Sequence, residues 1–389
     1  MITLLSKIFI KNRQELQSPA VRQAYGVLCG SVGIGLNLLL FAGKCLAGIL
    51  SGSIAITADA VNNLSDAGSS LITLIGFRMA GQKPDTDHPF GHGRIEYLSG
   101  LFVSIAILLM AVELIKSSFS KILHPEEITC TPLIVIILVV SVFVKIYMSV
   151  YNRRIGEKID SAAMYATAAD SLSDTLATTV VLLSTLCARF FGLQIDGYCG
   201  IAVGLFILTA GIKAAKETIS PLLGQPPKKE FVEQIEQLVL SHQGIIGVHD
   251  LIVHDYGPGR MMISLHAEVP ADCDILSMHD LIDNIEHDLR RELKCDAVIH
   301  MDPVCINDKE TVHMKELTTE LIRQISPELS IHDFRIIKGP THTNLIFDLV
   351  IPFRFPYSDT QTTQMLQEKI QAYDPSYFAV IDVDHTCTL

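Results

Sequence analysis

The chain has 389 residues, of which 49% are hydrophobic and only 19% are charged, and it contains no Trp. This balance excludes an ordinary soluble globular protein, and the formal net charge of −12 argues against nucleic acid as a partner. Apolar segments fill the part before about residue 220, while the rest is acidic and contains His, which indicates a membrane part and a soluble part.

The first part contains apolar segments long enough to cross a hydrocarbon core of about 30 Å as helices. We predict six transmembrane helices in residues 1–220, at about 26–50, 53–80, 97–118, 131–152, 162–188 and 195–215. Lys and Arg gather in alternate short loops, which places both termini in the cytoplasm. Lys44 and Lys145, each near a segment end, are expected to extend their ammonium groups toward the membrane surface.

Two of these segments carry polar pairs with one spacing. Asn62 and Asp66 lie four residues apart in the second segment, as do Asp170 and Asp174 in the fifth, so each pair projects from one helix face. A carboxylate near the bilayer centre costs roughly 3 kcal/mol, so these side chains require a bundle interior or an ion. Their oxygen atoms suit a hard divalent cation. Asp59 shares this face, as an exit-path residue or a polar cap.

The loop between the second and third segments reads DTDHPFGHGRIE. Its Asp85, His88 and His92 are candidates for a second metal site with mixed oxygen and nitrogen ligands. Ordinary solvated histidines are the alternative interpretation of this spacing.

The soluble part shows a repeated pattern of helix and strand periodicities. The order helix, strand, strand, helix, strand occurs at 228–242, 247–255, 260–269, 275–293 and 296–302, and again at 311–326, 330–338, 342–353, 359–372 and 377–385. We therefore predict two tandem cytoplasmic α+β domains of the ferredoxin-like, α-β-β-α-β kind, over residues 226–305 and 306–389.

Two aligned stretches support a duplication. VHDLIVHDYGPGRMMISLHAEV matches IHDFRIIKGPTHTNLIFDLVI, and AVIHMDP matches AVIDVDH. Side chains that can bind metal in the first copy are His249, His266, His279, His300 and Asp302. The matching residues of the second copy are His332, Asp348, Gln361, Asp382 and Asp384, a set less suited to a borderline metal such as zinc.

These motifs together resemble the cation diffusion facilitator family of divalent-metal transporters. The resemblance spans about residues 20–303 and rests on the paired motifs of segments two and five, the HPFGHGRIE loop, and HDL, LHAEV, MHDL and IHMDP in the first soluble domain. One departure is Gly224, which stands where other members often have an Asp that pairs with a basic residue, here Arg94. Another is the extra domain after residue 305.

The resemblance implies a homodimer in the plasma membrane that exports cytosolic divalent metal in exchange for protons by alternating access. It implies a transport site at Asn62, Asp66, Asp170 and Asp174, and a loop site at Asp85, His88 and His92. It also implies cytoplasmic metal positions at His249, His266, His279, His300 and Asp302, where metal draws two subunits together. Three carboxylates in one site repel one another and favour a bound proton, which an arriving metal ion would expel.

The transported metal is predicted from the ligand types. Zinc-type members usually carry a His in helix five and often one in helix two, where this chain has Asp170 and Asn62. Losing both imidazoles favours harder ions, so we predict Mn²⁺, with Zn²⁺, Fe²⁺ or a broad divalent range as the alternative. A membrane-anchored metal sensor is the rival of another class. No signature of a hydrolase or a phosphate loop indicates an enzyme.

Overall fold

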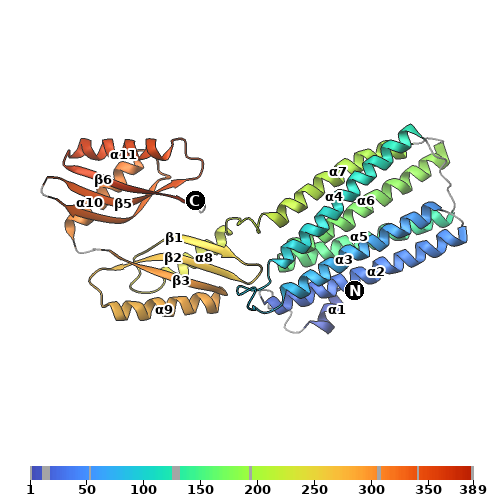
Figure 1. Ribbon diagram of the computed structural model, residues 1–389, viewed down its shortest axis with the longest axis horizontal. Coiled ribbons are helices and arrows are strands. Elements are labelled where there is room, and N and C mark those ends of the chain that lie inside the picture. The colour runs from blue at the N-terminus through green and yellow to red at the C-terminus, as the bar shows by residue number, and fades with distance from the viewer. Residues whose placement is uncertain are drawn as a thin grey trace. The chain divides into compact units, whose positions relative to one another are not determined.

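The computed structural model describes residues 2–10, 18–51, 54–124, 132–191, 195–304, 308–339 and 341–386. The chain divides into two compact units (Figure 1). The first is Met1–Gln225 with Asp255–Arg260, and the second is Pro226–His254 with Met261–Leu389.

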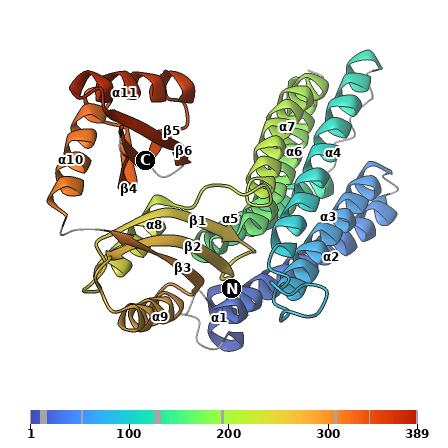
Figure 2. The ribbon, with the colours of Figure 1, turned by 60° about the vertical axis from the view of Figure 1, so that its left-hand side comes forward.

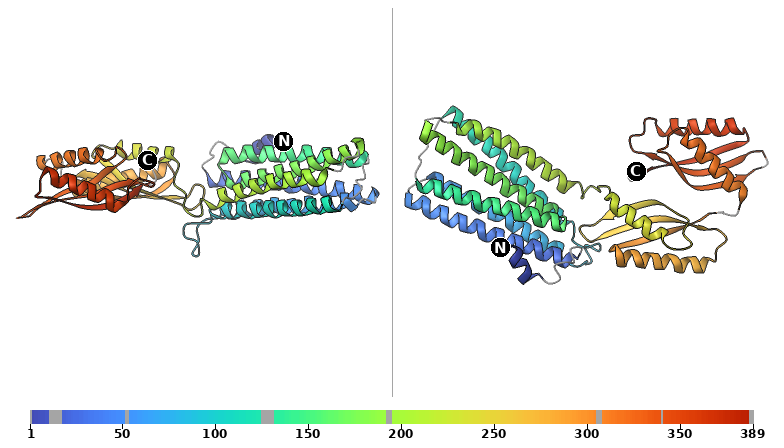
Figure 3. Two further views of the ribbon diagram at one scale, coloured as in Figure 1. Left: turned by 90° about the horizontal axis from the view of Figure 1, so that it is seen from above. Right: turned by 180° about the vertical axis from the view of Figure 1, so that it is seen from behind.

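The described part of the first unit is a helical bundle. A short helix α1 (Ile2–Phe9) precedes the long helices α2 (Pro19–Ser51), α3 (Ile54–Ala80), α4 (Ile95–Leu123), α5 (Pro132–Ile159), α6 (Ala162–Phe191) and α7 (Asp196–Ile219). The long helices run side by side in both views of Figure 3. At about 1.5 Å per residue, even the 24-residue α7 is longer than a hydrocarbon core of about 30 Å.

Four helices of the described part are long and apolar enough to cross a membrane, with spans Ala20–Leu46, Ile95–Leu123, Val135–Ile159 and Gly197–Ile219. The other two long helices, α3 and α6, carry Asp66, Asp170 and Asp174 in place of apolar residues. That α3 and α6 also cross the membrane, which would make six spans, remains a prediction. The helices also extend beyond the predicted segments, because polar residues such as Arg153 and Lys158 continue the helix after the apolar pattern ends.

The second unit contains two copies of one small fold (Figure 2). The first is α8 (Lys229–Leu240), β1 (Gly247–Asp255), β2 (Met261–Pro270), α9 (Ile275–Glu292) and β3 (Cys295–Val304). The second is α10 (Lys309–Arg323), β4 (Ser330–Lys338), β5 (Thr343–Pro352), α11 (Asp359–Tyr373) and β6 (Tyr377–Thr386). These elements confirm the predicted α-β-β-α-β order in both copies.

Each copy has its own three-stranded sheet, with strand orders β1-β2-β3 and β4-β5-β6. Strands β2 and β3 are parallel, as are β5 and β6, so each pair needs a crossover, which α9 and α11 provide. Alternate side chains of each sheet pack with both helices of that copy, around Leu265 in the first core and Leu345 in the second. The other face of each sheet is therefore free of helices and carries the polar side chains.

Both copies share a backbone irregularity in their first strand. Asp250 and Asp333 have positive φ angles of 52° and 51°, which Asp tolerates better than most residues. In the second copy, the pairing of β4 with β5 shifts register between His332 and Arg335. Such a bulge lets two successive side chains, a His and then an Asp, lie on the helix-free face.

Because each copy has its own core, a core mutation should destabilise only the copy that contains it. Leu345→Ala should lower the stability of the second copy by about 2–5 kcal/mol, because it leaves a cavity at a fully buried position. Hydrogen exchange of the full chain should then accelerate in residues 309–386 and stay unchanged in 229–304, with Leu265→Ala giving the reverse. Equal acceleration in both ranges from either substitution would show one shared cooperative domain.

Candidate metal centre

Helices α3 and α6 bring three carboxylates together inside the bundle. Asp66 comes from α3 and Asp170 and Asp174 from successive turns of α6, and one oxygen atom of each lies within 4.8 Å of the others. Their exposed fractions are only 5%, 4% and 9%. Within the described residues, Oδ1 of Asp170 is buried without a hydrogen-bond partner. Free buried carboxylate oxygens are available as ligands for a cation.

A lysine on α5 completes this cluster. The Nζ atom of Lys145 lies 2.6 Å from Oδ2 of Asp66 and 2.6 Å from Oδ2 of Asp174, and Lys145 is 2% exposed. The expectation that Lys145 extends to the membrane surface is therefore wrong. Because α5 continues to Ile159, Lys145 lies near the middle of the helix, where an unpaired ammonium group would be strongly unfavourable. The sequence signal for these ion pairs was a lysine inside an apolar segment of a chain that has carboxylates in other apolar segments.

Hydroxyl and amide contacts hold the helices around the carboxylates. The Oγ1 atoms of Thr73 and Thr167 lie 3.0 Å apart and join α3 to α6. Asn37 donates to Ser70 at 3.4 Å and joins α2 to α3. These buried contacts between small polar side chains fix the helix positions without adding charge.

Asn62, the fourth predicted ligand, is not part of the buried cluster. Its side chain is exposed, whereas the next residue, Asn63, is 2% exposed. The side chain of Asp59 lies outside the described part of the structure. The structure therefore assembles Asp66, Asp170 and Asp174 and leaves Asn62 apart from them.

The predicted loop trio is also brought together. Asp85, His88 and His92 offer ligand atoms within 4.8 Å of one another. Nε2 of His92 lies 3.4 Å from Oδ2 of Asp85, and the backbone N–H of His88 donates to Oδ1 of Asp85 at 2.7 Å. That amide, with the two imidazoles, lowers the pKa of Asp85 and keeps it a carboxylate. The side chain of His88 is 62% exposed, so this trio is open to solvent.

Arg94, which in other family members often pairs with an Asp at the position of Gly224, here binds the backbone of Asp255. Its Nε and Nη2 atoms donate to the backbone carbonyl of Asp255 at 2.9 and 2.6 Å, and Tyr97 donates to the Asp255 carboxylate at 2.9 Å. Gly224 itself has a φ of +86°, a conformation that suits glycine. Arg94 therefore fixes the turn between β1 and β2, which belongs to the first unit.

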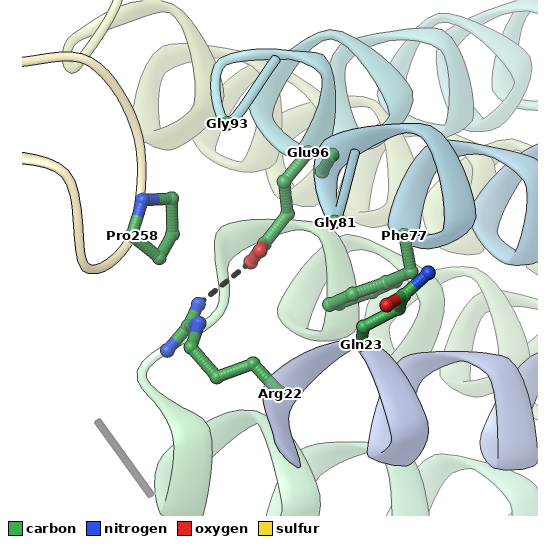
Figure 4. A pocket seen from close by; sticks show the side chains of 8 residues that line it. Arg22, Gln23, Phe77, Gly81, Gly93, Glu96 and Pro258 are labelled. Carbon is green, nitrogen blue, oxygen red and sulfur yellow. Dashed lines mark hydrogen bonds and ion pairs between the residues drawn. The ribbon is translucent and has the colours of Figure 1, made fainter. Parts of the chain in front are cut away.

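A small pocket lies beside this turn (Figure 4). Its main feature is the buried ion pair between Arg22 of α2 and Glu96 of α4, with Nη2 and Oε1 2.9 Å apart. The cavity of about 20 Å³ has room for about one water molecule. We interpret it as a structural connection between two helices and not as a substrate site.

A third cluster lies on the helix-free face of the first small sheet. Nδ1 of His266 is 2.9 Å and Nε2 of His249 is 3.2 Å from Oδ2 of Asp302. His300, opposite His266 in the β2–β3 register, lies 3.3 Å from Asp302. Four of the five predicted positions thus come together. His279 does not join them, because it is exposed on α9, which packs on the other face.

Sequence reasoning overlooked Asp250 in this cluster. Nδ1 of His249 lies 3.3 Å from Oδ2 of Asp250. Burial disfavours a charged His249, but this hydrogen bond and the nearby carboxylates outweigh burial and raise the pKa of His249. The same hydrogen bond lowers the pKa of Asp250. The signal for Asp250 was the His-Asp dipeptide that occurs at the same place in both copies.

Comparison with known proteins gives a consistent result. Residues 31–223 match the cation efflux transmembrane domain, and residues 227–304 match the cation efflux protein cytoplasmic domain. An uncharacterized transporter of Methanocaldococcus jannaschii is 34% identical over 269 residues, which cover 69% of this chain and 95% of that protein. The cation-efflux pump FieF of Escherichia coli is 28% identical over 294 residues, covering 75% of this chain and 98% of the pump.

Neither family match extends beyond residue 304, so the second copy of the small fold lies outside both. The bundle and the first copy, in contrast, correspond to the two domains in their usual order. The chain therefore belongs to the cation diffusion facilitator family and is a divalent-cation efflux transporter, not an enzyme.

Proposed function

We propose that this transporter exports Mn²⁺ from the cytosol in exchange for protons. The observation that carries the proposal is the buried cluster of Asp66, Asp170 and Asp174, which offers oxygen atoms and no imidazole. Oxygen-only sites suit Mn²⁺ and harder ions, while a nitrogen or sulfur ligand favours Zn²⁺. Fe²⁺ is the nearest alternative cargo, because it lies beside Mn²⁺ in the order of ligand affinities.

Lys145 supplies the positive charge of the metal-free site. Its ammonium group lies between Asp66 and Asp174 at the distance of a strong ion pair, on oxygen atoms that a metal ion would use. A divalent ion that binds these oxygens must displace the ammonium group. Lys145 is therefore an internal competitor of the cargo, and the site always holds a cation.

Proton exchange follows from the same competition. Protons, Lys145 and metal ions all bind the oxygens of three carboxylates that repel one another when bare. A high proton concentration outside would displace the metal there, and a low one inside would favour its binding. Alternating access of the bundle to the two sides then couples metal export to proton entry.

Further parts of the proposal concern assembly. Helices α3 and α6 cross the membrane with the four apolar helices, both termini are cytoplasmic, and two chains form a homodimer in the plasma membrane.

The loop trio of Asp85, His88 and His92 is proposed as an accessory metal site. Asn62, one helical turn before Asp66, is proposed as the fourth ligand of the metal-bound state, and its exposed side chain would have to turn inward.

The first prediction of this proposal concerns metal flux. Purified protein in liposomes with an imposed pH gradient should move Mn²⁺ well ahead of Zn²⁺, and Asp174→Ala should lower Mn²⁺ flux at least about tenfold, since it removes a ligand. The control is Glu217→Ala, which removes an exposed carboxylate of α7 and should leave flux unchanged. Zn²⁺ flux equal to or above Mn²⁺ flux would refute the selectivity, and full activity of Asp174→Ala would refute the site.

The second prediction concerns the proposed fourth ligand. Asn62→His should lower the ratio of Mn²⁺ to Zn²⁺ flux by about tenfold, which corresponds to about 1.4 kcal/mol of differential binding by the added imidazole. Competition between the two metals in the liposome assay measures this ratio. An unchanged ratio would show that Asn62 does not contact the ion.

The third prediction concerns Lys145. Lys145→Met should destabilise the metal-free protein by about 3–5 kcal/mol, because it leaves buried carboxylates without a counterion. Mn²⁺ should restore much of that loss and should raise the melting temperature more than in the unchanged protein. Lys213→Met, at an exposed lysine of α7, is the matched control. If Lys145→Met melted like the unchanged protein with and without Mn²⁺, Lys145 would not be the internal cation.

A further inference from the structure

The helix-free faces of the two small sheets meet within the second unit. The imidazole rings of His249 and His332 stack with their centroids 4.1 Å apart, one from each copy. Asp250 of the first copy lies 3.5 Å from His332 of the second. A cavity of about 400 Å³ opens here and is lined by residues of both copies, among them His266 and Asp348. The two copies thus share one polar site.

His332 is the residue that indicates a missing ligand. It is only 7% exposed, and within the described residues neither ring nitrogen has a hydrogen-bond partner. A buried polar group without a hydrogen-bond partner is unfavourable unless something else satisfies it. An occupant that accepts the lone pair of an imidazole nitrogen would remove this cost.

The distances around His332 are those between ligands of one metal ion. Nε2 lies 3.4 Å from Oδ2 of Asp384 and 3.5 Å from Oδ1 of Asp250. One ligand atom each of His332, Asp348 and Asp384 also lies within 4.8 Å of the other two. Both distances from Nε2 exceed the usual hydrogen-bond length of about 2.7–3.2 Å. Two ligands at about 2.1 Å from a tetrahedral metal are about 3.4 Å apart. A cation between Nε2 and the carboxylates therefore fits without moving the backbone.

We propose that the second copy completes a divalent-cation site with the first copy, within one chain, formed by His249, Asp250, His332, Asp348 and Asp384. Imidazole and carboxylate ligands together suit a borderline ion of the Zn²⁺ class. The site is distinct from the oxygen-only cluster in the bundle. It gives residues 308–386 a task, which is to supply ligands and to close the site over the first copy.

Charge and neighbouring contacts agree with this assignment. The site has three carboxylates and two imidazoles, and Arg335, which also lines the cavity, is paired with Asp333 at 2.9 Å. An ion pair between Lys315 of α10 and Glu268 of β2, 3.6 Å apart, joins the two copies beside the site. The excess negative charge is left for a bound cation.

The test counts Zn²⁺ ions bound per chain. Every sample is the full chain with Asp174→Ala, so that Zn²⁺ binding at the bundle cluster is equally weak throughout. Equilibrium dialysis then compares this chain with the same chain that also carries His332→Leu. We expect one Zn²⁺ fewer per chain in His332→Leu. His342→Leu, at an exposed His of the same copy, is the control and should bind as before.

Hydrogen exchange tests the shared nature of the site. Zn²⁺ should slow exchange in residues 247–255 and 330–338 together, and His332→Leu should abolish the effect in 330–338. Asp384→Asn should weaken Zn²⁺ binding at least about tenfold, and since the Asp384 side chain is 45% exposed, its loss leaves the fold intact. An unchanged ion count in His332→Leu and unchanged affinity in Asp384→Asn, or protection confined to 247–255, would overturn the proposal.

Discussion

The ion pairs of Lys145 with Asp66 and Asp174 are the interactions on which the bundle depends. Three carboxylates with at most 9% exposure would repel one another strongly if nothing balanced them. The ammonium group of α5 offsets part of that repulsion and connects α5 to α3 and α6. The cluster that we propose as the transport site therefore has a counterion of its own when no metal is bound.

The chain combines two kinds of ligand chemistry in separate side-chain clusters. The cluster inside the bundle offers oxygen atoms only, whereas the loop trio and the clusters of the second unit mix imidazoles with carboxylates. Ligands of different softness rank the same ions differently. A metal that the bundle moves well need not be the one that the soluble site holds most tightly. Under the two proposals above, one protein would transport one ion while another occupies the soluble site.

Features that follow from local periodicity could be predicted from the sequence, and those that depend on distant contacts could not. All ten elements of the small folds were predicted, because helix and strand periods appear within a few residues of sequence. The carboxylates were found from a four-residue spacing. Lys145 was misjudged, because its partners lie 79 and 29 residues away. Whether Asn62 or Asn63 faces inward depends on the rotation of α3, which packing sets and spacing does not.

The positive φ of Asp250 and Asp333 shows that the two copies share a backbone feature, although other side chains on the same sheet faces differ. His266 and His300 of the first copy correspond to Asp348 and Asp382 of the second, so one half of the shared face is richer in nitrogen and the other in oxygen. Two identical halves would form a symmetric pair. Here the pair is polar, and covalent linkage fixes its ratio at one to one. The two copies thus form an asymmetric pair of domains, like a heterodimer, within a single chain.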